Sequence, residues 1–205
     1  MAEYITLYSN SPNPRVLAHI VEVLNRGGLI IYPTDTVYAL GCLSNNIKAL
    51  DRFAKIKEVK LEQAPLSFLF QDIRELSQYV APMDAPTFKL VKKLLPGPYA
   101  LIMTAAQKLP KPFAKRKTIG VRISNHLILK QLLPLLDAPL ITSSLHDPDE
   151  ILDYTTDPET LFQRWENRID AMLADGYGGN VPSTVIDLSV QPFEVIRVGA
   201  GEPPF

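Results

Sequence analysis

Hydroxyl and guanidinium side chains recur in this 205-residue chain at the points where apolar segments end. In the segment "IIYPTDTVYALGC", Thr34, Asp35 and Thr36 separate two apolar runs, and Arg122 and Arg197 stand within two other apolar segments. Serine and threonine donate hydrogen bonds at short range, and arginine binds phosphate or carboxylate through two parallel N–H groups. This pattern predicts a pocket for a ligand with anionic groups. Further hydroxyls at such boundaries occur in "RIS" at 122–124, "TSS" at 142–144 and "PST" at 182–184.

A structural explanation competes with this prediction. A single serine or threonine at a strand end commonly serves a turn or a cap, but an unpaired arginine inside an apolar strand is costly. The candidate structural partner is Asp187, which the predicted hairpin places opposite Arg197. If the arginines bind ligand instead, we expect Arg122→Ala to reduce ligand affinity and to change the thermal midpoint little. Asp35 is expected to accept hydrogen bonds from amides of its own turn, with a role as catalytic base as the alternative.

The residues that would support a metal centre or a cysteine nucleophile are few. Cys42 is the one cysteine in the sequence, so it cannot form an intrachain disulfide, and its apolar neighbours predict a packed thiol. The three histidines, His19, His126 and His146, are far apart and lack the spacing of metal ligands. We therefore expect no protein metal site and no catalytic nucleophile.

The net charge of −1 gives no general attraction to nucleic acid or to an acidic membrane surface. One segment is densely basic: "KLPKPFAKRK" contains Lys115, Arg116 and Lys117 next to Phe113. We interpret it as a solvated loop, with a phosphate-binding patch for tRNA or double-stranded RNA as the alternative. The sequence shows neither a secretory leader nor a membrane-spanning run, so we expect a cytoplasmic protein with no membrane partner.

Apolar periodicity and turn residues predict alternating strands and helices in one α/β domain. Gly27 ends the first helix, Asp72 and Asp84 are expected to cap later helices, and Pro134 breaks another. The short joint "VQP" predicts that the last two strands form an antiparallel hairpin, so a mixed sheet is expected. Helices are predicted over 14–26, 47–57, 72–80, 85–95, 127–136 and 158–168, and strands over 4–8, 29–32, 65–70, 99–105, 118–123, 138–144, 170–176, 183–189 and 193–199.

Four ordered segments resemble one known family. "PTDTVYALG", "TIGVRISNH", "PSTVID" and "VIRVGAG" are similar, in order and spacing, to the YrdC/YciO family, the threonylcarbamoyl-AMP synthase family of tRNA modification. The resemblance runs from Gly27 to Gly201. It implies that residues 1–205 form a single α/β domain, with a strongly twisted mixed parallel and antiparallel sheet, flanking helices and a basic concave cavity.

The resemblance also implies a nucleotidyltransferase reaction. In that family, threonine and bicarbonate form a carbamate that attacks the α-phosphate of ATP, which gives L-threonylcarbamoyladenylate and pyrophosphate for the modification of tRNA adenosine. ATP is then a substrate that brings Mg²⁺ with it. Positioning and charge stabilisation by Lys57, Arg122 and Arg197 replace a protein nucleophile. Carried over by motif, the implied threonine contacts are Thr34, Thr36, Tyr38, Arg122 and Ser183, and the implied nucleotide contacts are Lys57, Ser144, His146 and Arg197.

Two departures from the family pattern bear on activity. Where active members carry K-x-R-P, this chain reads "KIKEVKLEQAP", so Lys57 stands for the lysine and Val59 for the arginine. The S-x-N segment is Ser144-Leu145-His146 here, so an imidazole replaces an amide. Both differences are typical of the YciO branch rather than the TsaC branch, and they imply weak, altered or absent synthesis. The alternative is a nucleotide- or double-stranded-RNA-binding module of the same fold without catalysis.

Overall fold

Capping side chains fix where the helices begin. In the computed structural model, which describes residues 2–7, 12–62, 64–145 and 156–205, Asp72 and Asp84 accept hydrogen bonds from the amides of Glu75 and Thr87. Both predicted caps are therefore confirmed. No helix in these ranges is long and apolar enough to cross a membrane. The helices are α1 (Pro14–Asn25), α2 (Ile47–Ile56), α3 (Ile73–Leu76), α4 (Ala85–Leu94), α5 (Leu127–Leu132) and α6 (Pro158–Trp165), with 3-10 turns η1 (Phe113–Lys115) and η2 (Leu133–Leu135).

The strands of the described residues form one mixed sheet. They are β1 (Glu3–Thr6), β2 (Ile30–Tyr32), β3 (Ala39–Leu43), β4 (Ser67–Leu69), β5 (Tyr99–Thr104), β6 (Thr118–Arg122), β7 (Leu140–Ser144), β8 (Ala171–Ala174), β9 (Thr184–Asp187) and β10 (Glu194–Arg197). Their order in the sheet is β1-β8-β2-β3-β7-β4-β6-β5-β9-β10. The pairs β1/β8, β2/β8, β4/β6 and β5/β9 are parallel and the rest are antiparallel. The predicted hairpin is confirmed as β9/β10.

The sequence prediction omits β3, which lies near the middle of the sheet. All five of its residues are buried, and it pairs antiparallel with both β2 and β7. A strand buried on both faces shows no alternation of apolar and polar residues. Gly41 also weakens the strand signal, yet it is needed here because a Cβ at this position would lie 2.7 Å from the ring of Tyr32.

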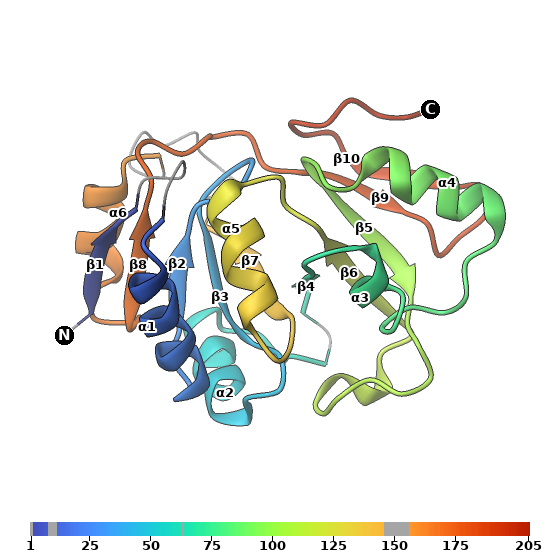
Figure 1. Cartoon of the computed structure of the whole chain (residues 1–205). Helices are drawn as coiled ribbons and strands as arrows, with labels where there is room; N and C mark the ends of the chain where they lie inside the picture. The colour runs from blue at the N-terminus through green and yellow to red at the C-terminus, as the bar shows by residue number, and fades with distance from the viewer. Residues whose placement is uncertain (1, 8–11, 63, 146–155) are drawn as a thin grey trace.

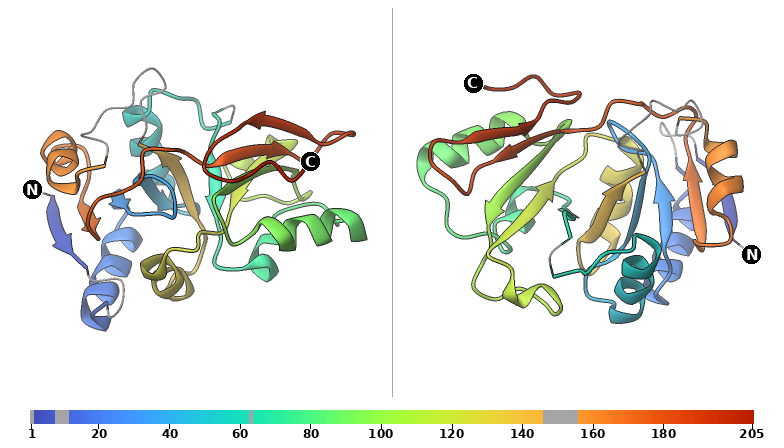
Figure 2. Two further views of the ribbon diagram at one scale, coloured as in Figure 1. Left: turned by 90° about the horizontal axis from the view of Figure 1, so that it is seen from above. Right: turned by 180° about the vertical axis from the view of Figure 1, so that it is seen from behind.

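Helices cover the sheet on both sides. α1 and α5 pack with β2, β7 and β8 in one apolar cluster that includes Ile20, Ile30 and Leu140. Figure 1 shows α1, α3, α4 and α5 on the viewer's side of the sheet, and Figure 2 shows α2 and α6 on the other side. α2, α4 and α6 belong to a second apolar cluster. Cys42 is buried in that cluster, where burial raises the pKa of its thiol, so the predicted packed thiol is confirmed.

One face of the sheet packs against helices in one half of the sheet and lines a cavity in the other half. The register pairs Leu140 with Leu69 and Leu69 with Arg122, so these three side chains lie on the same face. Leu140 and Leu69 pack in the cluster of α1 and α5, whereas Arg122 lines a cavity. Among the described residues, none that lines this cavity belongs to a helix. The right-handed twist of the strands turns this face away from α5 and leaves it open for a ligand.

Gly120 on β6 allows β4 to approach closely, and its substitution tests this packing. A Cβ at this position would lie 2.8 Å from the carbonyl oxygen of Leu66 and 2.7 Å from Oγ of Ser67. Because the Leu66 carbonyl belongs to the backbone, it cannot rotate aside, and we expect Gly120→Ala to lower the free energy of unfolding by about 1–3 kcal/mol. Urea denaturation measures the change. Thr118→Ala, on the same strand and the same side, is the control and should cost less than about 1 kcal/mol. Equal losses in the two variants would contradict the packing argument.

Candidate functional site

A cavity of about 560 Å³ lies on the open part of the sheet. It brings together six residues named from the sequence. Lys57, Arg122, Ser144, Ser183 and Arg197 belong to the implied substrate and nucleotide contacts, and Arg116 belongs to the alternative RNA-binding patch. No Asp or Glu among the described residues lines it, so the charged side chains of its wall are all cationic. The convergence that the sequence pattern predicts is therefore present in the fold.

Arg122 and Arg197 lie in one row across the sheet. Val185 pairs with both Ala100 and Arg197, and the register of β5 with β6 sets Ala100 beside Arg122. Neighbouring strands are about 4.8 Å apart, so the α-carbons of the two arginines are roughly 14 Å apart along the sheet. Small side chains between two guanidinium groups leave room for a ligand with an anionic group at each end.

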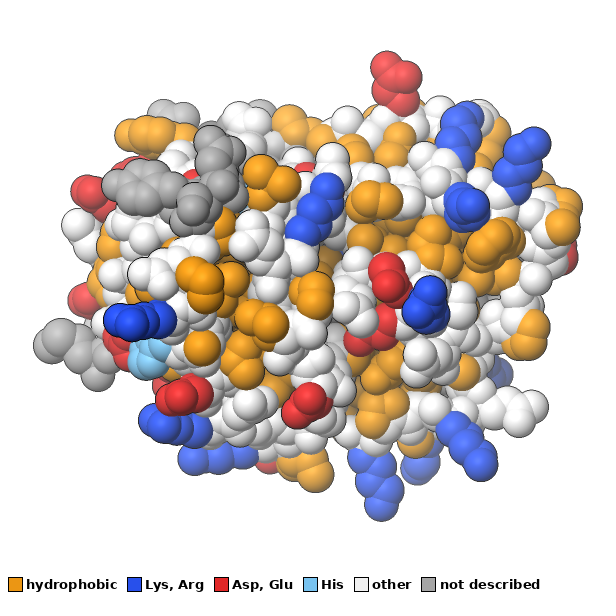
Figure 3. Space-filling model, in the orientation of Figure 1, with side chains coloured by type: hydrophobic (Ala, Val, Ile, Leu, Met, Phe, Trp, Pro, Cys, Tyr) orange, Lys and Arg blue, Asp and Glu red, His pale blue; other side chains and the backbone are white. Residues whose placement is uncertain are grey.

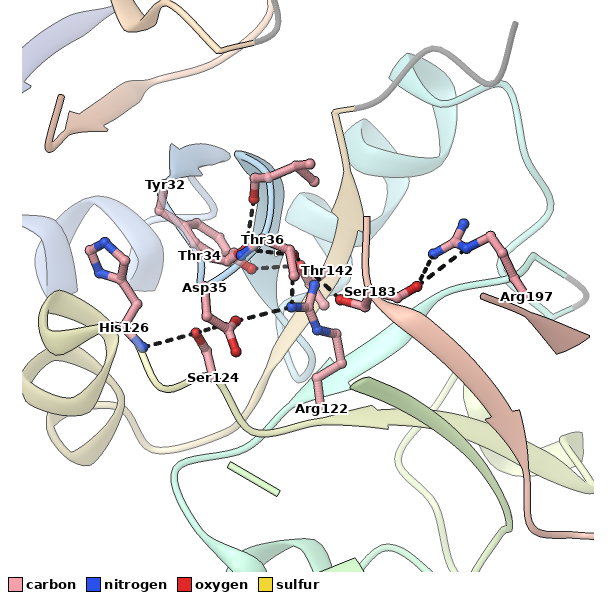
Figure 4. Close-up of polar contacts among 11 residues, drawn as sticks. Tyr32, Thr34, Asp35, Thr36, Arg122, Ser124, His126, Thr142, Ser183 and Arg197 are labelled. Carbon is pink, nitrogen blue, oxygen red and sulfur yellow. Dashed lines mark hydrogen bonds and ion pairs between the residues drawn. The ribbon is translucent and has the colours of Figure 1, made fainter. Parts of the chain in front are cut away.

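Arg122 is buried and is held by the turn that follows β2. Its side chain is 5% exposed, and Nη2 donates to Oδ1 of Asp35 at 3.2 Å and to Oγ1 of Thr36 at 3.3 Å (Figure 4). Oδ1 of Asp35 also accepts from the hydroxyl of Ser124 at 2.8 Å. Burial lowers the pKa of the Arg122 guanidinium, and the charge of Asp35 opposes this shift. The prediction that Asp35 accepts from amides of its own turn is wrong, because Oγ1 of Thr34 accepts from the Thr36 amide instead.

The pair of Arg122 and Asp35 is not satisfied by the described part of the chain alone. Nε of Arg122 and Oδ2 of Asp35 are both buried and have no hydrogen-bond partner there. Buried donors and acceptors are nearly always paired, and an unpaired one costs free energy. Arg122 lines the cavity, whereas Asp35 lies behind it, so the unpaired Nε of Arg122 favours a ligand-binding role over a purely structural ion pair.

The hydroxyls predicted to contact a substrate gather beside Arg122. Oγ1 of Thr36 and Oγ of Ser183 are 3.3 Å apart, and both residues are buried. Thr34 donates to the carbonyl of Val37 at 2.7 Å and thereby braces the turn. Ser183 lines the cavity, whereas Thr34 and Thr36 lie outside the set of residues that line it and support Ser183 and Arg122 (Figure 4). Direct contacts of Thr34 and Thr36 with threonine stay predictions.

Tyr38 lies outside the set of residues that line the cavity. It is fully buried, its hydroxyl donates to the carbonyl of Gly176 at 2.7 Å, and the amide of Asp175 donates to it at 3.2 Å. Desolvation raises the pKa of Tyr38 to about 12, so the phenol stays protonated and remains a donor. His126 is 3.5 Å from the Asp175 carboxylate. Tyr38 and His126 therefore hold the loop after β8 beside the site, and a direct contact of Tyr38 with threonine stays a prediction.

Arg197 does not pair with Asp187, the candidate partner in the structural explanation. Its Nη2 donates to the carbonyl oxygen of Ser183 at 2.7 Å, whereas Oδ1 of Asp187 accepts from Ser189. A register shift in β10 places Arg197 opposite Val185. The alternative explanation, a structural ion pair of Arg197 with Asp187, is therefore not supported. Within the described ranges no carboxylate forms a salt bridge with Arg197, so its charge remains available to a ligand.

Lys57 and Ser144 reach the cavity from the end of α2 and the end of β7. Burial lowers the pKa of Lys57. Val59 lines the same cavity, so the position at which the family pattern has an arginine provides no hydrogen-bond donor from its side chain. His146 lies outside the described residues, and its contact with a nucleotide stays a prediction.

Arg116 lies in a different environment from its basic neighbours Lys115 and Lys117. Lys115 and Lys117 are exposed, and Figure 3 shows lysine and arginine side chains along the lower edge of the molecule, where the η1 turn lies in Figure 1. Their contact with RNA stays a prediction. Arg116 is half-buried, lines the cavity and donates to the carbonyls of Leu61 and Ala64. It is therefore a cavity residue rather than part of a surface patch.

The sequence contained a signal for Arg116 that our prediction did not use. Alternate residues of a strand point to the same face, and Arg122, Gly120 and Thr118 all line the cavity, so two further positions back along the chain lead to Arg116. Thr142 and Ser143 of the predicted hydroxyl segment at 142–144 also line the cavity, and Ser67 on β4 is a cavity residue that the sequence prediction omits.

The pair of Arg122 and Asp35 can be tested by a double-mutant cycle. Arg122→Met leaves the Asp35 carboxylate buried without its partner and should lower the free energy of unfolding by about 3–5 kcal/mol. This expectation replaces the small change in thermal midpoint drawn from the sequence. The double variant Arg122→Met/Asp35→Leu should lose less than the sum of the two single variants in urea denaturation.

Arg197→Met is the control for this cycle. Its guanidinium is exposed, so the substitution should cost less than about 1 kcal/mol. Additive losses for Arg122→Met and Asp35→Leu would contradict an energetic coupling between the two buried charges.

Comparisons with known proteins identify relatives of this chain. A family model for Sua5, YciO and YrdC, described as "Telomere recombination", matches residues 22–199. An uncharacterized protein of Haemophilus influenzae is 36% identical over 203 residues, which are 98% of this chain and 97% of the relative. The uncharacterized protein YciO of Escherichia coli is 34% identical over 205 residues, which are 98% of each chain.

Solved structures share the fold. The crystal structure of E. coli YciO matches with a TM-score of 0.88 over 98% of both chains. Sua5 of P. abyssi in complex with L-threonine is 23% identical and matches with a TM-score of 0.82 over 96% of this chain and 57% of Sua5. The predicted α/β domain with a mixed sheet is confirmed. Because the family model spans most of the sequence and YciO is similar over nearly its full length, the chain belongs to the Sua5/YciO/YrdC family.

Proposed function

We propose that the protein is a nucleotidyltransferase that forms L-threonylcarbamoyladenylate and pyrophosphate from L-threonine, bicarbonate and ATP, for the threonylcarbamoyl modification of tRNA. The observation that carries this proposal is the row in which Arg122 and Arg197 line one cavity on either side of Ala100 and Val185. An amino-acid carboxylate at one arginine and a phosphate at the other are then held in one cavity, as a reaction between them requires. The Sua5 structure of the same fold is a complex with L-threonine, which makes threonine the first amino acid to test.

The Arg122 end of the cavity suits the amino acid. The hydroxyls of Thr36 and Ser183 lie beside the guanidinium, and together these groups provide short-range donors for one carboxylate. Asp35 neutralises part of the charge of Arg122. This end therefore favours a ligand with one negative charge and a nearby amino group over a polyphosphate.

The reaction needs positioning and charge compensation more than a protein nucleophile. The amino nitrogen of threonine attacks the carbon of bicarbonate and water leaves, which gives the carbamate. A carbamate oxygen then attacks the α-phosphorus of ATP, the bond from this phosphorus to the bridging oxygen breaks, and pyrophosphate leaves. Lys57 and Arg197 compensate the charge on the phosphates. Mg²⁺ enters as part of the nucleotide complex, since cations of this kind are commonly held by substrate phosphates.

Pyrophosphate release tests the proposal. Purified protein with ATP, L-threonine, bicarbonate and Mg²⁺ should release pyrophosphate, and the release should stop when threonine or bicarbonate is omitted. Because Val59 provides no phosphate contact, we expect a lower rate than that of a known synthase assayed alongside. No release above a buffer blank, with the known synthase active, would contradict catalysis. Calorimetric binding of ATP without release would favour the nucleotide-binding module instead.

Arg197 provides a charge at the phosphate end that can be removed without disturbing the core, because its side chain is exposed. Hydrogen bonds to charged groups contribute about 1.5–3 kcal/mol, so Arg197→Met should weaken ATP binding about tenfold or more. Isothermal titration calorimetry measures the dissociation constant. Threonine binding, which centres on Arg122, should change little. An equal loss for ATP and for threonine would contradict the assignment of Arg197 to the phosphate end.

A further inference from the structure

The four cationic side chains of the cavity differ in how far the protein neutralises them. Arg122 forms a salt bridge with Asp35 at 3.2 Å. For Lys57, Arg116 and Arg197, no carboxylate in the described part of the chain lies within ion-pair distance. Three cations without a salt bridge line one cavity of about 560 Å³ and favour an anionic ligand, although the more distant carboxylate of Glu62 partly offsets the charge of Arg116.

Arg116 is the most firmly oriented of these three. Its Nε and Nη2 donate to the carbonyl of Leu61, and Nη2 also donates to the carbonyl of Ala64. Its guanidinium carbon lies 5.7 Å from the centre of the ring of Phe113, which is fully buried. These contacts fix the plane of the guanidinium group. Among the described residues none accepts from its remaining nitrogen, Nη1, so two N–H groups of a preoriented cation are left for a ligand.

Arg116 and Arg122 lie at opposite ends of the cavity. β6 runs from Thr118 to Arg122, and four steps of about 3.3 Å put these two residues roughly 13 Å apart. Arg116 precedes Thr118, and its guanidinium is held there by the carbonyls of Leu61 and Ala64. Lys57 and Val59 line the same cavity. A ligand whose carboxylate lies at Arg122 therefore needs an elongated anionic part to reach this end, and a triphosphate has that shape.

We propose that Arg116 binds the terminal phosphates of the nucleotide through its free Nη1 edge, in the cavity that Lys57 also lines. This inference rests on the proposed function, because it assumes that the elongated ligand is ATP. The side chain of Val59, which also lines the cavity, cannot donate a hydrogen bond, and Arg116 provides a guanidinium donor in place of the arginine that the family pattern has at that position. Arg116 is thus a nucleotide-binding residue that also holds the segment of Leu61 and Ala64 in place.

The dependence of affinity on phosphate number tests this assignment. Calorimetric titration of wild type and Arg116→Gln with ATP and with AMP should give a loss of about tenfold or more for ATP and little change for AMP, because charge-assisted contacts to the terminal phosphates are absent in AMP. Arg116→Lys should retain part of the ATP affinity, since it keeps the charge but loses the fork. Lys115→Gln is the matched control: it removes the same charge from an adjacent exposed position and should leave both affinities unchanged.

The outcomes separate a ligand contact from a structural role. Equal losses of ATP and AMP affinity in Arg116→Gln would overturn the proposal and leave Arg116 with a structural role alone. An unchanged ATP affinity would lead to the same conclusion. If wild type binds no ATP, the proposed function fails. Titration with inorganic tripolyphosphate then tests whether Arg116 binds polyphosphate, independently of the nucleotide. A tripolyphosphate affinity that falls in Arg116→Gln and not in Lys115→Gln supports the polyphosphate site, whereas equal affinities or no binding overturn it.

Discussion

The burial of the Arg122 charge is the constraint on which the site depends. A guanidinium group removed from water is costly unless its charge and its N–H groups are compensated, and this residue is only 4% exposed. Asp35 and Thr36 provide the compensation, and both belong to the turn after β2. That turn is braced internally by Thr34 and lies against Ser183. One buried charge therefore fixes the relative positions of β6, the turn and the start of β9. Arg122 and Ser183 of these segments line the end of the cavity that we propose binds the amino acid.

The cavity itself is a consequence of sheet twist. A single row of residues crosses β7, β4, β6, β5, β9 and β10 on the same face of the sheet, and its members are Leu140, Leu69, Arg122, Ala100, Val185 and Arg197. The two leucines pack with α5 in the apolar core, and the other four line the cavity. Because twist accumulates from strand to strand, a helix that covers one half of a face cannot follow it across the other half. The same row is therefore core at one end and binding site at the other.

Features that depend on residues close together in the chain could be predicted from the sequence. The cap at Asp84 and the β9/β10 hairpin are of this kind, since each is decided within a few residues. Features that depend on register or on distant partners could not. An irregularity in β10 moves Arg197 away from Asp187, and Asp35 finds its partner 87 residues further along the chain. Arg116 was missed for a different reason, because its lysine neighbours resemble a solvated patch and conceal the two-residue period that places it in the cavity.

The cationic side chains of the cavity differ in whether a carboxylate of the protein pairs with them. At Arg122 the carboxylate of Asp35 neutralises part of the positive charge, so this end attracts a second negative charge less strongly than a first. At Lys57, Arg116 and Arg197 the described residues provide no carboxylate within ion-pair distance, so these positions favour several negative charges. If the amino acid and the nucleotide were bound the other way round, the polyphosphate would lie beside Asp35. Its attraction to the cations without a salt bridge would then be lost. In-line attack on phosphorus depends on orientation more than on any reactive side chain. The fold therefore contributes to such a reaction mainly by leaving certain cationic side chains of the cavity without a salt-bridge partner.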